Sequence, residues 1–498
     1  MSIENLTARW LAEPKDPEKV VIYSEQGNLT YLSLQQQVCQ LAGAFETMKL
    51  LENERVIIAM DDSSALYISF LASVACGAIP IVVNPKLSKE NLTFIINDSQ
   101  ASLLISKQDD VIQFHFYHNM KLSKTISLDD LLSFGVLNWN NYHYKQEDDI
   151  AFMQYTSGTT GSPKGVMHSS KNALSSVRFF AKDVLHANSA DRFYSLAKSF
   201  FGYGLGNSLF FPLECGASVV LDADWPSPNR VLENLLRYRP SVFFGVPAMY
   251  QALLSNKSTK EAFASVRATV SAGASLPEKL FTSWEAEFNT PILDGLGSTE
   301  LCHIFCSQKS DSAQAGSLGK ALQEYDIEIR DQQGNVVPND VCGNMWVKGP
   351  SLSLGYWQNP SATEIKFQSG WYNTGDLATR DKRGCIYFKG RSDDLFKVNG
   401  RWVIPCDIEK GLLSEFSSVI ELAIVPVLDE NGLTKAALFI VTNDNNVSSL
   451  LSDINNWCQM NLSNYQRPLH IKVLSTLPRN DNGKVIRKLL SLELDGVV

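Results

Sequence analysis

Apolar strands and amphipathic helices alternate through the middle of the chain. An apolar segment at 217–221 precedes a helical pattern at 229–239, and another apolar segment follows at 241–246. A strand, a crossover helix and a second strand in this order form a βαβ unit, whose strands pair in parallel. The pattern therefore predicts an α/β fold with mostly parallel sheets.

The next unit repeats this order and ends in a polar loop. A strand is expected at 268–271, and Ser275 and Glu278 have the spacing of a capping box that would open the following helix. The unit closes on an apolar strand that runs into the loop GLGSTE at 295–300. Loops at the carboxyl ends of parallel strands are where α/β sheets bind ligands, so this loop is a candidate for the site.

The character of the sequence changes after Arg391. Two strands around a turn at Asn431 and Gly432, then a helix and a short strand, are expected in this order: 422–427, 436–441, 450–460 and 470–474. The pattern predicts a separate α+β lobe of roughly 100 residues, within the usual size of a domain. The expected domains are residues 1–391 and 392–498.

Composition excludes several classes of protein. With 44 Lys and Arg against 53 Asp and Glu, the formal net charge is -9, which argues against nucleic acid as a partner. The nine cysteines are scattered and form no CxxC pair, as is typical of reduced thiols in a cytoplasmic protein. Charges near the amino terminus, where a signal peptide has an apolar core, also favour the cytoplasm.

One apolar stretch, at 65–83, approaches the length of a membrane span. It is interrupted by Ser69, Ser73, Gly77 and Pro80, and it runs into a polar segment. These interruptions favour a buried helix that turns into a strand, so no membrane span is expected.

Residues 155–165 (YTSGTTGSPKG) place hydroxyls and glycines ahead of one lysine, directly after an apolar run. Glycines let the backbone approach an anion, hydroxyls and amides donate to its oxygens, and Lys164 adds a compact positive charge. Pro163 before the lysine and Gly165 after it do not fit the GxxxxGK[ST] pattern, which disfavours a P-loop kinase or GTPase. A flexible Ser/Gly linker is the alternative for this segment alone.

Together with GLGSTE, YNTGDL at 372–377, GRSDDLFKVNG at 390–400 and NDNGK at 480–484, this loop resembles the adenylate-forming superfamily. That superfamily contains acyl- and aryl-CoA synthetases, peptide-synthetase adenylation domains and luciferases. The motifs occur in the expected order over nearly the whole chain. The resemblance implies a large multi-layer amino-terminal α/β domain, mostly parallel in its sheets, with a small mobile α+β carboxyl-terminal lobe.

The resemblance also implies an ATP site with bound Mg²⁺. Glu300 matches the residue that helps to bind the metal, and Thr299 would lie near the α-phosphate. Asp376 would accept hydrogen bonds from the ribose hydroxyls, with Arg391 as the second ribose contact. Asp294 is a candidate acceptor for the adenine amino group. The β- and γ-phosphates would lie in the loop formed by Thr156, Ser157, Gly158, Thr159, Thr160, Gly161 and Lys164.

Lys484 matches the catalytic lysine of the superfamily, which bridges the attacking carboxylate and the ATP α-phosphate oxygens. Its positive charge would offset charge that accumulates in the transition state. Asp393 matches the hinge about which the small lobe rotates for the second step. The rotation would admit a thiol beside the loop from Lys397 to Gly400.

The segment at 197–221 and the loop at 294–305 are most similar to the benzoate-CoA ligase branch. Amino-acid-activating members carry an aspartate for the substrate ammonium, and Gly202 and Tyr203 stand here instead of an acid. The similarity implies an aromatic-acid pocket lined by Tyr203, Ala272, Gly273, His303 and Ile304. A structural role is the alternative for His303.

The expected enzyme is an AMP-forming acid-thiol ligase. It would convert a carboxylic acid of the benzoate, hydroxybenzoate or cinnamate type to an acyl-AMP and transfer the acyl group to coenzyme A. Loading of a carrier protein's phosphopantetheine is the second hypothesis. A nucleotide-binding regulator is disfavoured, because binding alone does not require Lys484.

Overall fold

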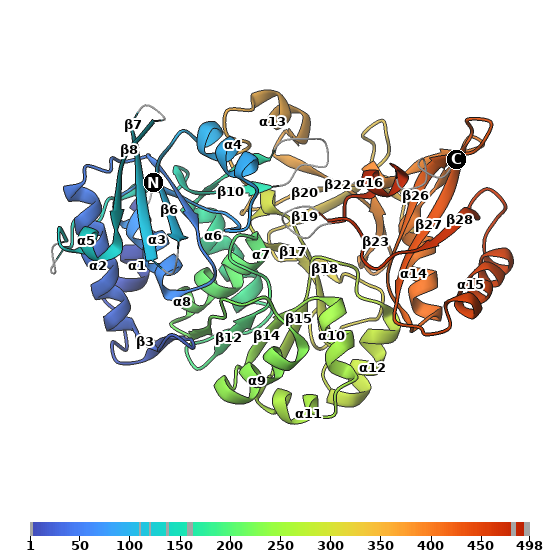
Figure 1. The fold of residues 1–498 in the computed structure, drawn as a ribbon, viewed down its shortest axis with the longest axis horizontal. Helices are drawn as coiled ribbons and strands as arrows, with labels where there is room; N and C mark the ends of the chain where they lie inside the picture. The colour runs from blue at the N-terminus through green and yellow to red at the C-terminus, as the bar shows by residue number, and fades with distance from the viewer. Residues whose placement is uncertain are drawn as a thin grey trace.

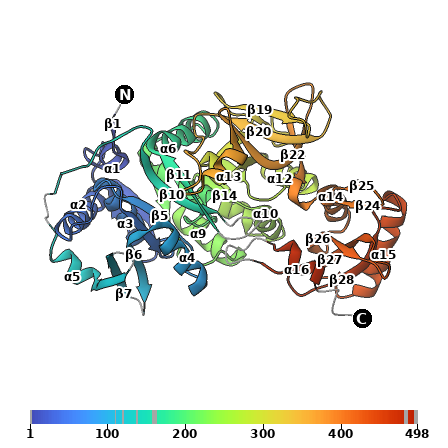
Figure 2. The ribbon, with the colours of Figure 1, turned by 90° about the horizontal axis from the view of Figure 1, so that it is seen from above.

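The computed structural model describes residues 3–108, 111–118, 121–135, 139–156, 163–479 and 485–492. Three large sheets and their helices form most of the molecule, and a smaller lobe lies at one end, in orange and red in Figure 1. The turned view in Figure 2 places this lobe at the same end. Within these ranges, no helix combines the length and the apolar character needed to cross a bilayer.

The first sheet has seven strands in the order β11-β10-β5-β4-β6-β7-β8. β10, β5, β4 and β6 pair in parallel, and antiparallel strands extend both edges. The bounds are β4 (Arg55–Ala59), β5 (Ile79–Val82), β6 (Ala101–Gln108), β7 (Val111–His118), β8 (Lys121–Ser127), β10 (Ile150–Thr156) and β11 (Lys164–Ser169).

Helix α3 (Ser64–Ala75) packs against β4 and β5 on one side and against α2 (Tyr31–Thr47) on another. Most of its side chains are buried, as expected for a helix that is apolar around its circumference. The chain then enters β5. The stretch at 65–83 is therefore a buried helix followed by a strand, as its interruptions predicted.

The second sheet has nine strands in the order β18-β17-β16-β15-β14-β12-β13-β2-β3. Its six central strands pair in parallel, and β3, β17 and β18 are antiparallel. The bounds are β2 (Val20–Tyr23), β3 (Leu29–Thr30), β12 (Arg192–Ser195), β13 (Ser218–Val220), β14 (Val242–Gly245), β15 (Ala268–Ser271), β16 (Ile292–Gly297), β17 (Ile304–Ser307) and β18 (Lys320–Ala321). The prediction of mostly parallel α/β sheets is confirmed.

One hydrophobic core joins the two sheets. Phe152 of β10, Phe70 of α3 and Phe210 of the helical segment η2 (Gly206–Phe210) contact one another, with ring centroids 5.1–6.2 Å apart. The same cluster contains Val56 of the first sheet and Phe244 of the second. The sheets therefore form one large multi-layer unit.

The third sheet is antiparallel and carries the loop that precedes the carboxyl-terminal lobe. Its order is β19-β20-β22-β21, and β23 also pairs with β22. The bounds are β19 (Asp326–Arg330), β20 (Gly343–Lys348), β21 (Phe367–Gln368), β22 (Trp371–Arg380) and β23 (Ile386–Arg391). The register places Asp376 opposite Arg391.

The carboxyl-terminal lobe has its own core. Val403, Leu412, Ile424, Leu438 and Ile454 are buried together in a separate cluster. The lobe contains β24 (Phe396–Val398), β25 (Arg401–Val403), α14 (Pro405–Glu415), β26 (Val419–Leu428), β27 (Thr434–Thr442), α15 (Val447–Asn461), β28 (Pro468–Val473) and α16 (Arg487–Leu492). The expected smaller α+β part is present.

The predicted capping box at Ser275 is wrong. Helix α12 (Glu278–Phe288) begins with Pro277 as its N-cap, and no side chain caps it. Pro277 is extended, with φ −63° and ψ 137°, so the helix cannot begin at Ser275. The strands and helices on either side lie within a few residues of the expected bounds.

Substitution of Trp284 in α12 tests how much the packing beneath the second sheet contributes to stability. Its side chain is fully buried, and its ring lies 4.2–5.1 Å from the rings of Tyr250, Phe263 and Phe288. Trp284→Ala should lower the free energy of unfolding by about 3–5 kcal/mol, because it leaves a large cavity. The control Leu51→Ala, at a side chain 62% exposed, should change it by about 0.5 kcal/mol or less. Equal urea midpoints for the two variants would contradict this description of the core.

Candidate active site

Buried polar atoms without partners gather near the carboxyl ends of β15 and β16 in the second sheet. Ser271 Oγ, at the end of β15, and Asp294 Oδ1, beside it in β16, have no hydrogen-bond partner among the described residues. Ser298 Oγ and Ser353 Oγ are also buried without a hydrogen-bond partner among the described residues. A buried polar group without a partner costs about 1–3 kcal/mol, so this edge of the sheets is suited to a ligand that supplies the missing partners.

The predicted phosphate loop connects two antiparallel strands of the first sheet. β10 ends at Thr156, β11 begins at Lys164, and these two residues are register partners. The hairpin therefore brings the two ends of the loop together. Ser157, Gly158, Thr159, Thr160 and Gly161 lie outside the described residues.

Glu300 is held by tyrosines of the third sheet and its preceding loop. It lies in the short helical turn η4 (Thr299–Leu301), where only 8% of the residue is exposed. The Tyr356 hydroxyl donates to Glu300 Oε1 at 2.8 Å, and Tyr372 also hydrogen-bonds this carboxylate. Lys164 Nζ lies 5.3 Å from the centroid of the Tyr356 ring, so the lysine and the glutamate meet around one tyrosine. The carboxylate is therefore fixed near Lys164, the residue that ends the predicted phosphate loop.

Asp376 and Arg391 form an ion pair across β22 and β23. Arg391 Nη1 donates to Asp376 Oδ1 at 2.8 Å and to the carbonyl oxygen of Thr374 at 3.0 Å. Arg391 Nε has no partner among the described atoms. Arg391 Nη2 also lies 3.8 Å from Asp393 Oδ2, so this one side chain links the predicted ribose site to the predicted hinge.

Asp294 differs from the other carboxylates of the site because it is fully enclosed. Burial raises the pKa of its side chain to about 8, although Lys410 and backbone amides oppose the shift. The Asp294 carboxyl is therefore largely protonated at neutral pH. In that state it offers both a donor hydroxyl and an acceptor oxygen.

The predicted acid-pocket residues Tyr203 and His303 lie next to each other. Their ring centroids are 5.5 Å apart, and His303 also contacts Phe180 and Phe211. Burial lowers the pKa of His303 to about 3, so the ring is neutral. Nε2 lies 3.0 Å from Asn207 Oδ1, whereas Nδ1 has no partner among the described atoms.

The other predicted pocket residues differ in exposure. Ala272 and Ile304 are buried, and Ile304 packs against Gly295. Gly273 is exposed, with φ +86°, a conformation that favours glycine. Ala272 and Gly273 directly follow β15, so they lie at the same edge as Ser271.

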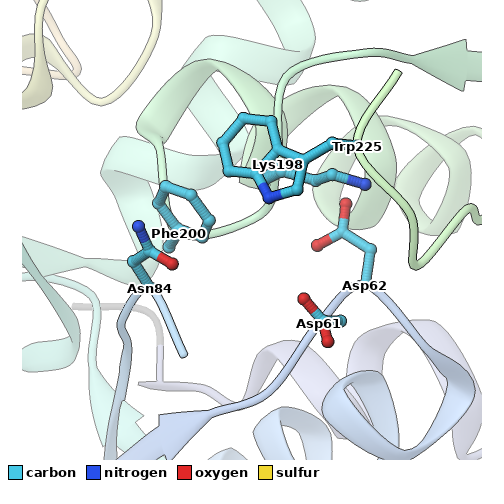
Figure 3. A pocket seen from close by; sticks show the side chains of 6 residues that line it. All are labelled: Asp61, Asp62, Asn84, Lys198, Phe200 and Trp225. Atoms are coloured by element: carbon cyan, nitrogen blue, oxygen red, sulfur yellow. The ribbon is translucent and has the colours of Figure 1, made fainter. Parts of the chain in front are cut away.

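A buried lysine anchors the loop that leads into α7 (Gly202–Leu205). Lys198 Nζ donates to the carbonyl oxygens of Asp222 and Asp224, both at 2.6 Å, and it points toward Asp62 in Figure 3. The Ser199 amide donates to Asp62 Oδ1 at 3.0 Å. A side chain at Gly204 would place its Cβ 2.0 Å from the Lys198 carbonyl oxygen, so only glycine fits there. These contacts fix the start of α7 and thereby the position of Tyr203.

The remaining predicted residues lie at or beyond the end of the third sheet. Asp393 is exposed in the turn η5 (Ser392–Asp394). Lys397 lies in β24, and Asn399 and Gly400 form the two-residue turn to β25, with φ of 50° and 77°. Positive φ at both positions matches the hairpin turns that favour Asn-Gly. Lys484 lies outside the described residues.

The structure adds residues that the motifs do not contain. Tyr356 holds Glu300. Lys366 of α13 (Pro360–Lys366) lies beside Arg391, and burial, together with the charge of Arg391, lowers the pKa of this lysine. Gln154 is buried behind Thr156. Nothing in the sequence marks Tyr356 or Lys366, because both lie between motifs. The sequence gives a weak indication for Gln154, because it is a polar residue within the apolar strand that precedes the loop.

The raised pKa of Asp294 predicts a pH-dependent stability. The folded chain holds this proton up to pH about 8, whereas an unfolded aspartate loses it near 3.8. Between these values the folded state binds more protons, so Asp294 lowers the free energy of unfolding as pH rises, by about 1.4 kcal/mol per unit. Asp294→Asn should remove this loss in urea titrations from pH about 5 to 8.

His168 and His303 act in the opposite direction below pH about 6.5, because burial lowers their pKa to about 4 and about 3. They are present in both proteins, so the difference between wild type and Asp294→Asn isolates Asp294. A difference that is constant with pH would contradict the prediction.

Comparison with known proteins agrees with this geometry. The model of the AMP-binding enzyme family matches residues 10–357. An anthranilate–CoA ligase of Pseudomonas aeruginosa is 39% identical over 98% of this chain and 96% of its own length. A benzoate–CoA ligase of Thauera aromatica is 33% identical over 94% of this chain and 92% of its own length.

Among solved structures, an anthranilate CoA ligase, AuaEII, in complex with anthranoyl-AMP superimposes with a TM-score of 0.90. It is 28% identical, and the match covers 99% of this chain and 97% of that one. The fold, the order of the motifs and the relatives lead to one assignment: this chain belongs to the AMP-binding enzyme family, among the acid-thiol ligases of the AMP-forming type.

Proposed function

We propose that this enzyme joins an aromatic carboxylic acid to coenzyme A in two steps. The acid's carboxylate oxygen attacks the α-phosphorus of ATP, and pyrophosphate leaves to give an acyl-AMP. The thiolate of coenzyme A then attacks the acyl carbon, and AMP leaves with the electron pair. The observation that carries the proposal is the gathering of Lys164, Glu300, Asp376 and Arg391 around one site, in a chain whose full-length relatives are aryl-CoA ligases.

In the first step, these charged side chains hold the nucleotide. Lys164 and the loop that begins at Thr156 bind the β- and γ-phosphates, and Thr299 lies toward the α-phosphate. Asp376 accepts hydrogen bonds from the ribose hydroxyls, and its contact with Arg391 orients its carboxylate. The neutral carboxyl of Asp294 suits the adenine edge, which presents a donor amino group beside an acceptor nitrogen.

Glu300 is the proposed protein ligand for Mg²⁺. Its buried carboxylate, held by two tyrosine hydroxyls near Lys164, fits an ion that is bound by one carboxylate together with substrate phosphates. When bound, the metal neutralises charge on the phosphate oxygens. The hydroxyls of Tyr356 and Tyr372 orient the carboxylate toward that task.

The aryl ring of the acid occupies the space beside Tyr203 and His303. A neutral histidine and a tyrosine in contact with Phe211 and Phe244 give an apolar wall. Ala272 and Gly273 form the opposite boundary at the end of β15, and Ile304 backs the site from β17. Such a slot suits a flat ring and excludes a charged ammonium.

The second step uses a rotation of residues 392–498 about Asp393. The rotation would break the ion contact between Arg391 Nη2 and Asp393 Oδ2, which is weak because it is 3.8 Å long and partly exposed. The rotation withdraws Lys484 and brings the hairpin of Lys397 and Gly400 to the thiol's path.

A carrier protein as acyl acceptor is not favoured, because relatives that match over nearly their full length are CoA ligases. We place the enzyme in the cytoplasm, where its nine free cysteines would stay reduced.

The roles of the two lobes are tested by Lys484→Ala. The change should lower the rate of pyrophosphate release by about 100-fold or more, because it removes a positive charge that stabilises the transition state of the first step. Transfer of preformed benzoyl-AMP to coenzyme A should stay within a few-fold of wild type. Lys488→Ala, at an exposed lysine of α16, is the matched control and should leave both steps intact. Equal loss of both steps in Lys484→Ala would contradict the division of labour.

A further inference from the structure

A second cavity lies away from the proposed active site, beside α2, α3 and β7. Its volume is about 460 Å³, within the range of sites that bind small molecules. Leu41, Met60 and Phe114 are buried at its inner end. Asn28 and Gln37 are exposed at its outer end, so the cavity runs from solvent to the core. Among the described residues that line it, none is assigned above to ATP or to the acid.

The lining of this second cavity suits an uncharged molecule. Two of its described lining residues carry a charge, Asp61 and Lys107, and these charges are opposite and exposed to solvent. The other polar groups are amides and hydroxyls, such as those of Gln40, Ser63 and Ser64. Neutral donors and acceptors around apolar walls orient a ligand by hydrogen bonds, while burial of its apolar body supplies the binding free energy.

One wall of the second cavity anchors the loop that leads into α7. Asp61 lines the cavity, and Asp62, the next residue, accepts a hydrogen bond from the Ser199 amide at 3.0 Å. Both aspartates lie in the turn from β4 to α3 (Figure 3). A shift of this turn would therefore move Ser199.

Another wall anchors the same loop through Lys198. Ala223 lines the cavity, and the carbonyl oxygens of its two neighbours, Asp222 and Asp224, both accept from Lys198 Nζ at 2.6 Å. Lys198 stands a few residues before Tyr203 of the proposed acid pocket. The loop that positions Tyr203 is therefore held by segments that a ligand in the cavity would contact.

We propose that this second cavity is an allosteric site for an uncharged amphipathic molecule with an aromatic body, and that its occupancy strengthens binding of the acid. A ligand packed against the turn from β4 to α3 and against Ala223 restricts both segments, and thereby fixes Lys198 and Ser199. Because this ligand already orders the loop, the acid then binds with a smaller loss of entropy. The site itself goes beyond the proposed function, whereas its effect on the acid rests on that function.

The first measurement is binding of prodan, an uncharged two-ring dye whose fluorescence reports an apolar environment. The full chain should bind one molecule saturably. Ala65→Phe and Ser64→Phe each place a ring in the cavity from the start of α3, and each should weaken binding by about tenfold or more, because the ring takes the space of the ligand. Ala286→Phe, at an exposed residue of α12, is the matched control and should bind as wild type does.

The second measurement is the KM for benzoate with and without saturating prodan. Prodan should lower this KM by about fivefold in wild type and in Ala286→Phe, and should leave it unchanged in the two filled variants. A dye bound in the acid pocket would compete with benzoate and raise the KM instead.

The proposal is overturned if wild type does not bind prodan saturably, if both filled variants bind it as wild type does, or if bound prodan leaves the KM of wild type unchanged or raises it. If wild type forms no benzoyl-CoA, the proposed function fails. The binding measurement does not depend on turnover, so it still decides whether the cavity is a ligand site.

Discussion

Parallel pairing of β12, β14, β15 and β16 brings the carboxyl ends of these strands to one edge of the nine-stranded sheet. There the backbone ladder ends, and single polar atoms such as Ser271 Oγ and Asp294 Oδ1 are buried without a hydrogen-bond partner among the described residues. The core beneath, with Phe193 and Phe244 stacked 6.0 Å apart, keeps this edge in place. A ligand that pairs with these polar groups would recover the free energy lost by burying them. The parallel topology therefore determines where on the sheet a ligand can bind.

Charge then organises the site around Arg391. This one guanidinium contacts Asp376 on β22 and Asp393 in the turn beyond β23, so the proposed nucleotide site and the start of the carboxyl-terminal lobe share a side chain. Lys366 adds a second positive charge nearby, and Glu300 is held in place by two tyrosine hydroxyls.

The sequence predicted the mostly parallel sheets, the smaller α+β carboxyl-terminal part and the strands of the βαβ units, because apolar periodicity reflects burial directly. It misplaced the start of α12, since the spacing of Ser275 and Glu278 imitates a capping box that Pro277 prevents. Asp376 and Arg391 were expected at one site, and the pairing of β22 with β23 brings them together. Tyr356 and Lys366 could not be foreseen, because their roles depend on contacts between distant segments. The raised pKa of Asp294 likewise depends on complete enclosure, which no local pattern reveals.

The central claim is that one site makes an aryl adenylate and then passes the acyl group to coenzyme A. The most direct test incubates the enzyme with ATP, Mg²⁺ and a panel of benzoates, with and without coenzyme A, and follows pyrophosphate release and product mass. The account predicts sustained turnover only with coenzyme A, and an aryl-CoA thioester formed in equal amount to pyrophosphate and AMP. Pyrophosphate release without any thioester, whether or not coenzyme A is present, would contradict it.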